Sequence, residues 1–424
     1  MDLIHTYLNK VRRFSPEARL YLLITMLQGI GWGIYQLFFN FYILSLGYRR
    51  DFMGLLISIP PMTALIVALF AGYVSDRVGY KRTLLLGSGL TVAAQVLMLI
   101  FPMRWMLIAA SALRGLGMSL FSVTSAPFLM EHSTEAERTH LFSFNSGVRT
   151  MSSFVGRVFG GAIPALIAGW IGVAPTDSLA YAGALGVTTL LMFIAMFPIS
   201  RLPLTHAVRT DDPMAPFRTL WQHRGTMTRL LLPSLVISLG AGMLIPFLNV
   251  FFRYRFGLSD SIIGSLFGFG SLGMGIALLV APVLAEKWGK AKTVVITQGL
   301  SIPFLIVLGF VPSLGLAIVS FLMRMALMNL SGPVYQTMVM EESDAESRNM
   351  TASLYSMIWN FGRAVTPSIS GPIQEVYGFT PVFVTTIVAY ALSVYLVYRW
   401  FVRRDRATEP QLRPDEATLS LKRG

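Results

Sequence analysis

A short charged loop decides the fold of this chain, and it reads Gly72-Tyr-Val-Ser-Asp76-Arg77-Val-Gly79-Tyr-Lys81-Arg82. Long apolar runs flank it on both sides, so we expect two membrane helices to turn at a water interface here. Gly72 and Gly79 permit close helix packing and a tight turn. Asp76 closes the first of these helices, where its carboxylate can pair with basic groups or with a helix N-terminus.

The composition agrees with a membrane location. The chain has 424 residues, of which 54% are hydrophobic and 13% are charged. A soluble protein of this size cannot cover so much apolar surface, so we expect a polytopic membrane protein. Runs of about 20 apolar residues fit spanning helices, and the alternating pattern of barrel strands is absent. Because there is no cysteine, disulfides and thiolate chemistry are excluded.

Twelve apolar segments follow one another along the chain. They lie at 19–46, 51–75, 83–102, 105–130, 139–170, 178–199, 229–254, 261–285, 292–311, 313–340, 349–374 and 380–402. The one long polar connection, a linker at 200–228, separates a bundle at 19–199 from a bundle at 229–402. A leader, 1–18, and a polar tail, 403–424, complete the chain. We therefore predict an all-α membrane protein with twelve transmembrane helices in two six-helix bundles.

The positions of Lys and Arg predict the orientation in the membrane. If both termini and the even-numbered connections share one side, that side holds 24 of the 34 basic residues. The opposite loops hold five, namely Arg49, Arg50, Arg104, Arg253 and Arg255. Since basic loops stay in the cytoplasm, we expect both termini on the cytoplasmic side of a cell (inner or plasma) membrane. This bias accounts for most of the net charge of +13 without a nucleic-acid partner.

The two predicted bundles match one another in sequence when the chain is shifted by 210 residues. No gap is needed, and the matched pairs include Asp76/Glu286, Gly79/Gly289, Arg82/Lys292, Arg114/Arg324, Glu131/Glu341 and Arg138/Arg348. Because charged residues are scarce here, their constant register indicates a duplicated six-helix unit. Two such repeats are pseudo-symmetric about an axis along the membrane normal, with a pathway between them.

With these residues in place, the chain resembles the major facilitator superfamily of secondary transporters over residues 19–404. The loop is similar to the family motif Gly-x-x-x-Asp-basic-x-Gly-x-basic-basic, with Gly72, Asp76, Arg77, Gly79, Lys81 and Arg82 in place and Tyr80 where a basic residue is common. The resemblance implies alternating access, with Asp76 latching the cytoplasmic ends of the bundles while the protein is open outward. The second copy is degenerate but keeps Glu286, Gly289 and Lys292. A plain positively charged turn is the alternative.

Two repeated pairs add to the predicted gate. Glu131 and Arg138, and their mates Glu341 and Arg348, share the spacing Glu-x6-Arg at the cytoplasmic ends of their helices. Each pair can bridge its own loop, or it can reach the turn that carries Asp76 or Glu286. A solvated loop explains one pair alone, whereas the duplication favours a gate network.

Five arginines fall inside predicted spans: Arg114, Arg149, Arg157, Arg324 and Arg363. A charge at mid-bilayer costs at least about 2.5 kcal/mol, and no Asp or Glu lies deep in any span. A bound anion, water or helix carbonyls must therefore satisfy some of them. The rigid fork of Arg suits carboxylate or phosphate, so we predict all five as substrate-site residues, with structural hydrogen bonds as the alternative.

The family resemblance gives two of these arginines a context. Arg114, followed by Gly115 and Gly117, is similar to the arginine of the family's fourth-helix motif, with Arg324 as its echo. Arg157 lies where the antiporter motif of the fifth helix would carry a proline, whereas Thr366-Pro367 in the second bundle keeps one. This departure argues against a simple drug/proton antiporter.

A polar and aromatic stripe follows the first span, at Gln28, Trp32, Tyr35, Gln36 and Asn40. Spacings of three or four residues bring these side chains to one side of a helix. Such a stripe suits a water-filled cavity that binds substrate, or it packs helices together. Gln336, Trp359 and Asn360, with Tyr335, are similar candidates in the second bundle.

Several kinds of chemistry lack the residues they need. All five histidines lie in loops or at span ends, so no obvious proton carrier lies at mid-membrane. Neither a Gly-x4-Gly-Lys-Ser/Thr phosphate loop nor a metal-ligand cluster is present, and we predict no catalytic residue, metal or cofactor.

The sequence therefore predicts a secondary transporter rather than an enzyme. We expect a monomer in the lipid bilayer that carries a small organic solute, with anionic or amphipathic character favoured, and that can also move protons or a counter-ion. The alternative is a multidrug-type proton antiporter, and a more remote one is a transporter-like receptor or sensor.

Overall fold

The computed structural model describes residues 14–204, 224–343 and 348–403, and every element in these ranges is helical. The first bundle consists of α2 (Pro16–Ser45), α3 (Arg50–Val78), α4 (Tyr80–Ile100), α5 (Arg104–Glu131), α6 (Glu135–Gly160), α7 (Ile163–Ile171) and α8 (Ser178–Ser200). The second bundle consists of α10 (Arg224–Leu244), the 3-10 turn η1 (Ile245–Phe247), α11 (Leu248–Phe256), α12 (Asp260–Trp288), α13 (Lys290–Phe310), α14 (Leu314–Glu341), α15 (Arg348–Tyr377), α16 (Thr380–Val397) and the π-helical turn η2 (Tyr398–Val402). Parts of the predicted leader, linker and tail lie outside the described residues.

The predicted fold of twelve helical spans in two bundles is confirmed. Gly160 and Gly161 lie at the junction of α6 and α7 in one span, and Pro246 lies in η1 between α10 and α11 in another. Among the described residues, 11 helical spans are long and apolar enough to cross a membrane. The twelfth span is α15, which carries Asn360 and Arg363 in its middle and packs along α3 and α10.

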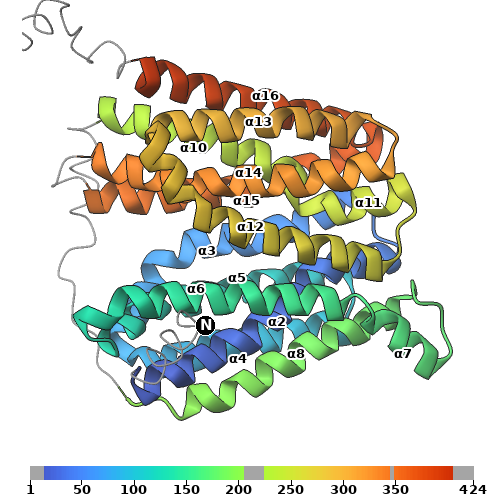
Figure 1. The fold of residues 1–424 in the computed structure, drawn as a ribbon. Coiled ribbons are helices and arrows are strands. Elements are labelled where there is room, and N and C mark those ends of the chain that lie inside the picture. The colour runs from blue at the N-terminus through green and yellow to red at the C-terminus, as the bar shows by residue number, and fades with distance from the viewer. Residues whose placement is uncertain (1–13, 205–223, 344–347, 404–424) are drawn as a thin grey trace, which may run out of the picture.

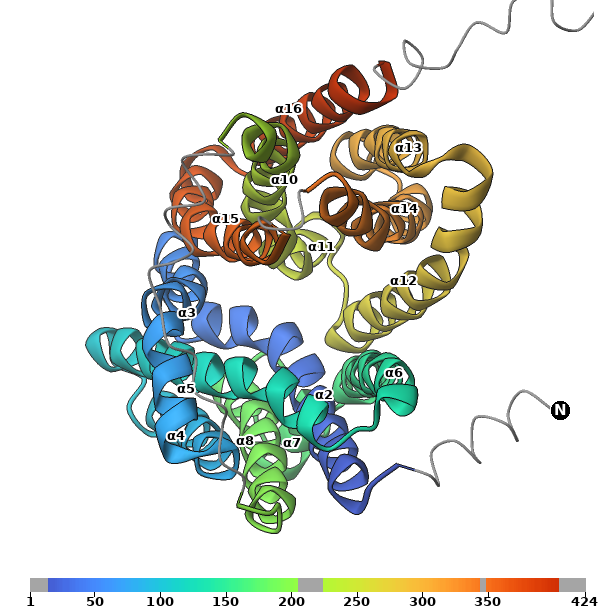
Figure 2. The ribbon, with the colours of Figure 1, turned by 90° about the vertical axis from the view of Figure 1, so that its left-hand side faces the viewer.

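The two bundles lie side by side, as Figures 1 and 2 show from two directions. In Figure 1, α2–α8 form the lower bundle and α10–α16 the upper one. We call the end where α2 begins and α16 ends the terminal end, and the opposite end the distal end. Two helix pairs, α3 with α15 and α6 with α12, make most of the contact between the bundles.

Repeat-related glycines shape the turn quoted at the start and its copy. Gly79 ends α3 with φ +89°, and Gly289 ends α12 with φ +81°, a region that favours glycine over residues with a side chain. The hydroxyl of Thr83 donates to the Gly79 carbonyl over 2.9 Å, and that of Thr293 donates to the Gly289 carbonyl over 2.8 Å. The 210-residue repeat is therefore visible in the backbone and its hydrogen bonds.

The apolar core is shared at the distal end and divided at the terminal end. One cluster of buried side chains joins both bundles at the distal end, with Phe38, Tyr42 and Tyr181 from the first and Phe247 and Phe252 from the second. Toward the terminal end, two separate clusters replace it, one within each bundle. The bundles are therefore packed together distally and are separate near the termini.

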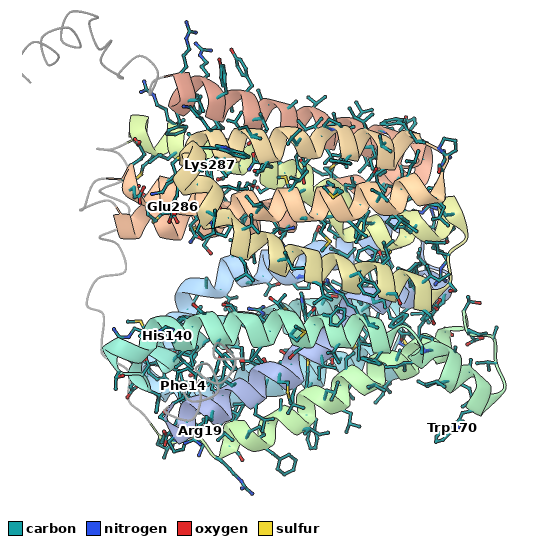
Figure 3. The ribbon with its side chains drawn as sticks, viewed as in Figure 1. Phe14, Arg19, His140, Trp170, Glu286 and Lys287 are labelled. Atoms are coloured by element: carbon teal, nitrogen blue, oxygen red, sulfur yellow. The ribbon has the colours of Figure 1, made fainter. Side chains whose placement is uncertain are left out.

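Large apolar side chains cover the outside of the molecule. Leu279 is 79% exposed, Phe70 67% and Leu166 68%, a level that water would penalise but lipid accepts. Trp170, at the tip of the distal end in Figure 3, is 94% exposed. Trp is enriched at membrane interfaces, so its position fits the boundary of a bilayer.

Candidate functional site

Glycine contacts hold the bundles together at the distal end in two pseudo-symmetric copies. A Cβ atom added to Gly54 on α3 would lie 3.2 Å from Cα of Gly371 on α15 and closer still to the Pro367 carbonyl. A Cβ atom added to Gly264 on α12 would likewise lie 3.0 Å from Cα of Gly161 and closer to the Arg157 carbonyl. The two helix pairs therefore approach at backbone distance.

Asn40 and Asn249 form a buried polar bridge between the bundles. Nδ2 of Asn40 donates to Oδ1 of Asn249 over 2.9 Å and to the Pro246 carbonyl over 2.6 Å. Nδ2 of Asn249 donates in return to the Leu37 carbonyl over 2.9 Å. Asn40 is 4% exposed and Asn249 3%, so both side chains are buried in the contact between the bundles.

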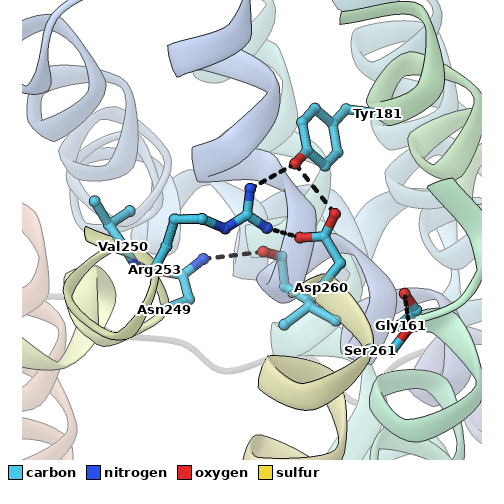
Figure 4. A network of polar contacts seen from close by, with 8 residues as sticks. Gly161, Tyr181, Asn249, Val250, Arg253, Asp260 and Ser261 are labelled. Atoms are coloured by element: carbon cyan, nitrogen blue, oxygen red, sulfur yellow. Dashed lines mark hydrogen bonds and ion pairs between the residues drawn. The ribbon is translucent and has the colours of Figure 1, made fainter. Parts of the chain in front are cut away.

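A charged network lies beside this bridge (Figure 4). Arg253 of α11 forms an ion pair with Asp260 of α12, within the second bundle. Tyr181 of α8 connects this pair to the first bundle, because its hydroxyl donates to Oδ2 of Asp260 over 3.1 Å and accepts from Nη1 of Arg253 over 2.9 Å. The Arg253 guanidinium also lies 4.0 Å from the ring centre of Phe41 on α2.

A second charged contact closes the other side of the distal end. Nε of Arg49 lies 3.2 Å from Oε1 of Glu375 on α15, and the backbone N–H of Arg50 donates to Oε2 over 3.0 Å. Nη1 of Arg50 donates to the Gln374 carbonyl over 3.1 Å. This contact and the network of Arg253 therefore each join the two bundles at the distal end.

The predicted gate residues lie at the terminal end. Lys290 forms an ion pair with Glu341, so Glu341 reaches the turn that carries Glu286. Glu286, Lys292, Arg77, Arg82 and Glu131 are exposed, whereas Lys81 and Arg138 are half-buried; Figure 3 shows Glu286 at this end. The burial of Gly72 and the side chains of Asp76 and Arg348 lie outside the described part of the structure. The latch role of Asp76 therefore stays a prediction.

Two of the five arginines within the spans have protein partners. Arg157 of α6 donates to Oε1 of Gln36 and Oγ of Ser271, with the Phe267 carbonyl at 3.5 Å, and it thereby joins the two bundles. Arg324 of α14 donates from Nη2 to the hydroxyl of Tyr390 over 2.7 Å. Arg324 is 4% exposed and makes this bond within its own bundle.

The other three arginines make no hydrogen bond or ion pair with any described residue. Arg114 is 3% exposed, and its guanidinium lies 3.7 Å from the ring centre of Tyr35 and 5.3 Å from that of Trp32. Nε and Nη2 of Arg114 have no partner. Arg149 on α6 and Arg363 on α15 have exposed side chains.

The remaining predicted substrate residues divide into two groups. Gln36 and Gln336 are exposed, and Trp32, Trp359 and Asn360 are half-buried, on three helices from both bundles. Nδ2 of Asn360 donates to the Ser356 carbonyl of its own helix over 3.1 Å. Gln28 lies within the first bundle, where Nε2 is 3.5 Å from Oγ of Ser88. Several polar side chains on helices of both bundles are therefore exposed or half-buried.

Sequence reasoning missed the residues that lock the distal end and the lysine that pairs with Glu341. Arg49, Arg50 and Arg253 appeared only as rare basic residues on the side with few positive charges. That rarity was a usable signal, because a basic residue that opposes the orientation bias needs another reason to be there. Lys290 and Ser271 gave no comparable signal.

The described residues contain no group of three or more His, Cys, Asp or Glu side chains placed to hold a metal ion. The unpartnered guanidinium groups are instead donors with a fixed geometry and a permanent charge. Guanidinium groups of this kind can bind a negatively charged group and orient it.

Comparisons with known proteins agree on the family. The model of the Major Facilitator Superfamily matches residues 21–237 and 230–423. The multidrug resistance protein MdtG of Proteus mirabilis (strain HI4320) is 24% identical over 413 residues, which cover 92% of this chain and 97% of that protein.

Solved structures share the fold at low sequence identity. A mutant form of the nucleoside transporter NupG has a TM-score of 0.75 at 12% identity over 91% of this chain and 100% of its own. A bacterial homologue of the human lysosomal transporter Spinster, in an inward-facing and unoccupied conformation, has a TM-score of 0.72 at 15% identity over 91% of this chain and 97% of its own. The twelve-span repeat, the turn motif and these matches lead to one conclusion: the chain belongs to the Major Facilitator Superfamily.

Proposed function

We propose that this protein is a secondary transporter that moves a small organic anion across the inner membrane of a bacterial cell by alternating access. The terminal end lies in the cytoplasm in this proposal, as the distribution of basic residues predicts. The distal end is then the outer gate. Its closure, and the division of the core near the termini, describe a carrier that is open toward the cytoplasm.

One observation carries the choice of an anion. Arg114, Arg149 and Arg363 each place a positive charge in the middle of a helix, and none of them has a carboxylate partner among the described residues. Charges in a low-dielectric environment are costly unless they are paired, so a substrate with negative charge is the natural partner. Trp32 and Tyr35, which lie against Arg114, favour a substrate that also has an apolar or aromatic part.

A thermal-shift screen of the purified protein tests this proposal. Succinate, benzoate, glycerol 3-phosphate and inorganic phosphate represent anions, and tetraphenylphosphonium represents lipophilic cations. We expect at least one anion to raise Tm, because a ligand at 100 times its Kd stabilises the native state by about 2.7 kcal/mol. Arg363→Gln should abolish the shift, and Arg104→Gln, which removes a charge at the distal end, should keep it. If only tetraphenylphosphonium raised Tm, the proposal that the substrate is an anion would be refuted.

The similarity to MdtG favours a second candidate, a multidrug-type proton antiporter. This candidate needs a titratable group at the substrate site, and all 21 Asp and Glu residues lie outside the span interiors. Transport that collapses with the proton gradient, together with unchanged affinity in Arg149→Gln, Arg157→Gln and Arg363→Gln, would support the antiporter over the anion carrier.

A further inference from the structure

We infer that the first bundle binds an anionic phospholipid of the cytoplasmic leaflet in a groove on α4, with the headgroup phosphate between Arg82 and Arg201. The inference takes only the orientation in the membrane from the proposed function, and it does not depend on the transported substrate. It assigns a ligand to the outer side of the turn from Gly72 to Arg82.

The groove runs along one face of α4 near the terminal end. It has a volume of about 500 Å³ and is lined by Val78, Arg82, Leu85, Leu86, Gly89 and Leu90. The α4 residues among these follow the i, i+3, i+4, i+7, i+8 pattern of a single helix face. Gly89 leaves room beside α8, because an added Cβ atom would lie 3.6 Å from Cε of Met196. Arg82 is therefore the one charged group in an otherwise apolar groove.

The groove faces outward from the molecule. Helix α4 packs on α5 and α8 at the outer side of the first bundle, away from the second bundle (Figure 2). Leu86 in the groove is 48% exposed, and Phe193 and Phe197 on the neighbouring α8 are 50% and 63% exposed. In a membrane-spanning chain, such a surface meets acyl chains rather than water. The apolar part of the groove therefore fits an acyl chain.

A second arginine lies at the same level as Arg82. Gly89 and Met196 place α4 and α8 side by side, and α4 begins at the terminal end, where α8 ends. Arg82 lies seven residues before Gly89, and Arg201 lies five residues after Met196. These separations correspond to about 10 Å and about 8 Å along the helix axes, both toward the terminal end. Packed helices are about 8–10 Å apart, so the two long side chains can reach one phosphate between them.

The charges of both arginines are available to a ligand. Both side chains are exposed, and neither guanidinium makes a hydrogen bond or ion pair with a described residue. Helices α4 and α8 contain no Asp or Glu, and the first turn of α4 has no side-chain cap. Arginine grips phosphate in two parallel hydrogen bonds, and the N-terminus of α4 adds partial positive charge. The same charges repel the ammonium group of a zwitterionic headgroup, so an anionic lipid is favoured.

Native mass spectrometry of the full chain in detergent tests the headgroup site, with phosphatidylglycerol and phosphatidylcholine as probes. We expect one phosphatidylglycerol molecule to bind at least about tenfold more tightly than phosphatidylcholine. Combining Arg82→Gln with Arg201→Gln should weaken phosphatidylglycerol binding by about tenfold or more, because charge-assisted hydrogen bonds are lost. Lys292→Gln, at the exposed position related to Arg82 by the repeat, is the matched control and should leave the Kd unchanged.

Gly89→Leu tests the acyl-chain groove separately. Its side chain fills the groove, so phosphatidylglycerol binding should again weaken by about tenfold, whereas Gly186→Leu on α8, where an added Cβ atom meets nothing within 4 Å, should not change it. The Tm of each lipid-free variant verifies that it folds.

Three results would overturn the inference: equal affinity for the two lipids, unchanged binding in the double arginine variant or in Gly89→Leu, and displacement of the lipid by inorganic phosphate, which would indicate a site for free phosphate. None of these measurements involves the central arginines. A thermal-shift screen in which no anion binds would refute the proposed function and leave the lipid site intact.

Discussion

Nδ2 of Asn40 lies 2.9 Å from Oδ1 of Asn249, and this buried hydrogen bond joins the two bundles at the distal end. Both side chains make further bonds to backbone carbonyls of the opposite bundle. The pair therefore exists only while the distal end is closed. In the proposed alternating access, its energy contributes to the balance between the two conformations.

Asn249→Ala should shift that balance toward the conformation that is open at the distal end. The variant removes the hydrogen bonds of Asn249 to Asn40 and to the Leu37 carbonyl and leaves Asn40 with the Pro246 carbonyl, at a cost of about 1–3 kcal/mol in the closed conformation. That cost corresponds to about a 5- to 150-fold change in the population ratio. Spin labels at Trp105→Cys and Leu316→Cys, both exposed and on opposite bundles, measure the distal separation. An unchanged distance distribution would remove Asn249 from the gate.

Tyr181→Phe and Asp260→Asn should affect the distal lock differently. The first variant removes the hydroxyl that connects the Arg253–Asp260 pair to the first bundle, and we expect a loss of about 1 kcal/mol in distal closure. The second leaves Arg253, whose side chain is 20% exposed, without its carboxylate. We expect about 3–5 kcal/mol of destabilisation, because a largely buried charge loses its partner. Thermal unfolding and the distal label pair measure the loss in each variant. Equal losses would contradict the expectation that Asp260→Asn is the more destabilising of the two.

Gly264→Leu should prevent the distal end from closing. A side chain at this position meets Gly161 and the Arg157 carbonyl at backbone distance, so α12 and α6 must separate. We expect transport to fall by about 100-fold, because interior overpacking of this kind costs about 1–3 kcal/mol or more. Gly273→Leu is a matched control on the same helix, since an added Cβ atom there meets nothing within 4 Å. Comparable losses in the two variants would point to misfolding, and retained transport in Gly264→Leu would disprove the close contact.

Arg114→Gln and Arg324→Gln should have opposite signatures although the two arginines are repeat-related. Arg114 has no hydrogen-bond partner for Nε or Nη2, so its loss should weaken anion binding by about 10- to 150-fold with little change in Tm. Arg324 bonds to Tyr390, so its loss should lower Tm and leave anion affinity unchanged. Titration of the anion found in the screen, together with thermal unfolding, measures both. Tyr390→Phe should reproduce the effect of Arg324→Gln. A loss of anion affinity in Arg324→Gln would instead place Arg324 in the substrate site.

The different contacts of Arg114 and Arg324 show where sequence comparison stops. In the register of 210 residues, the counterpart of Tyr390 is Ala180, and the counterparts of Tyr35 and Trp32 are Ile245 and Gly242. Each arginine therefore has the partner that the other lacks. The residues were visible in the sequence, but the contact of α14 with α16, and of α5 with α2, was needed to connect them.

The sequence by itself determined the architecture. Hydrocarbon requires every backbone polar group to be bonded within its own helix, so apolar length fixed the spans, and the turn from Gly72 to Arg82 with its copy fixed the repeat. Only the tertiary structure decided which arginines remain without partners and which residues lock the distal end. Those contacts join helices more than 100 residues apart and depend on how the two bundles are rotated against each other. In the proposed alternating access, one sequence supports both an open and a closed arrangement, so local pattern cannot specify the contacts of either.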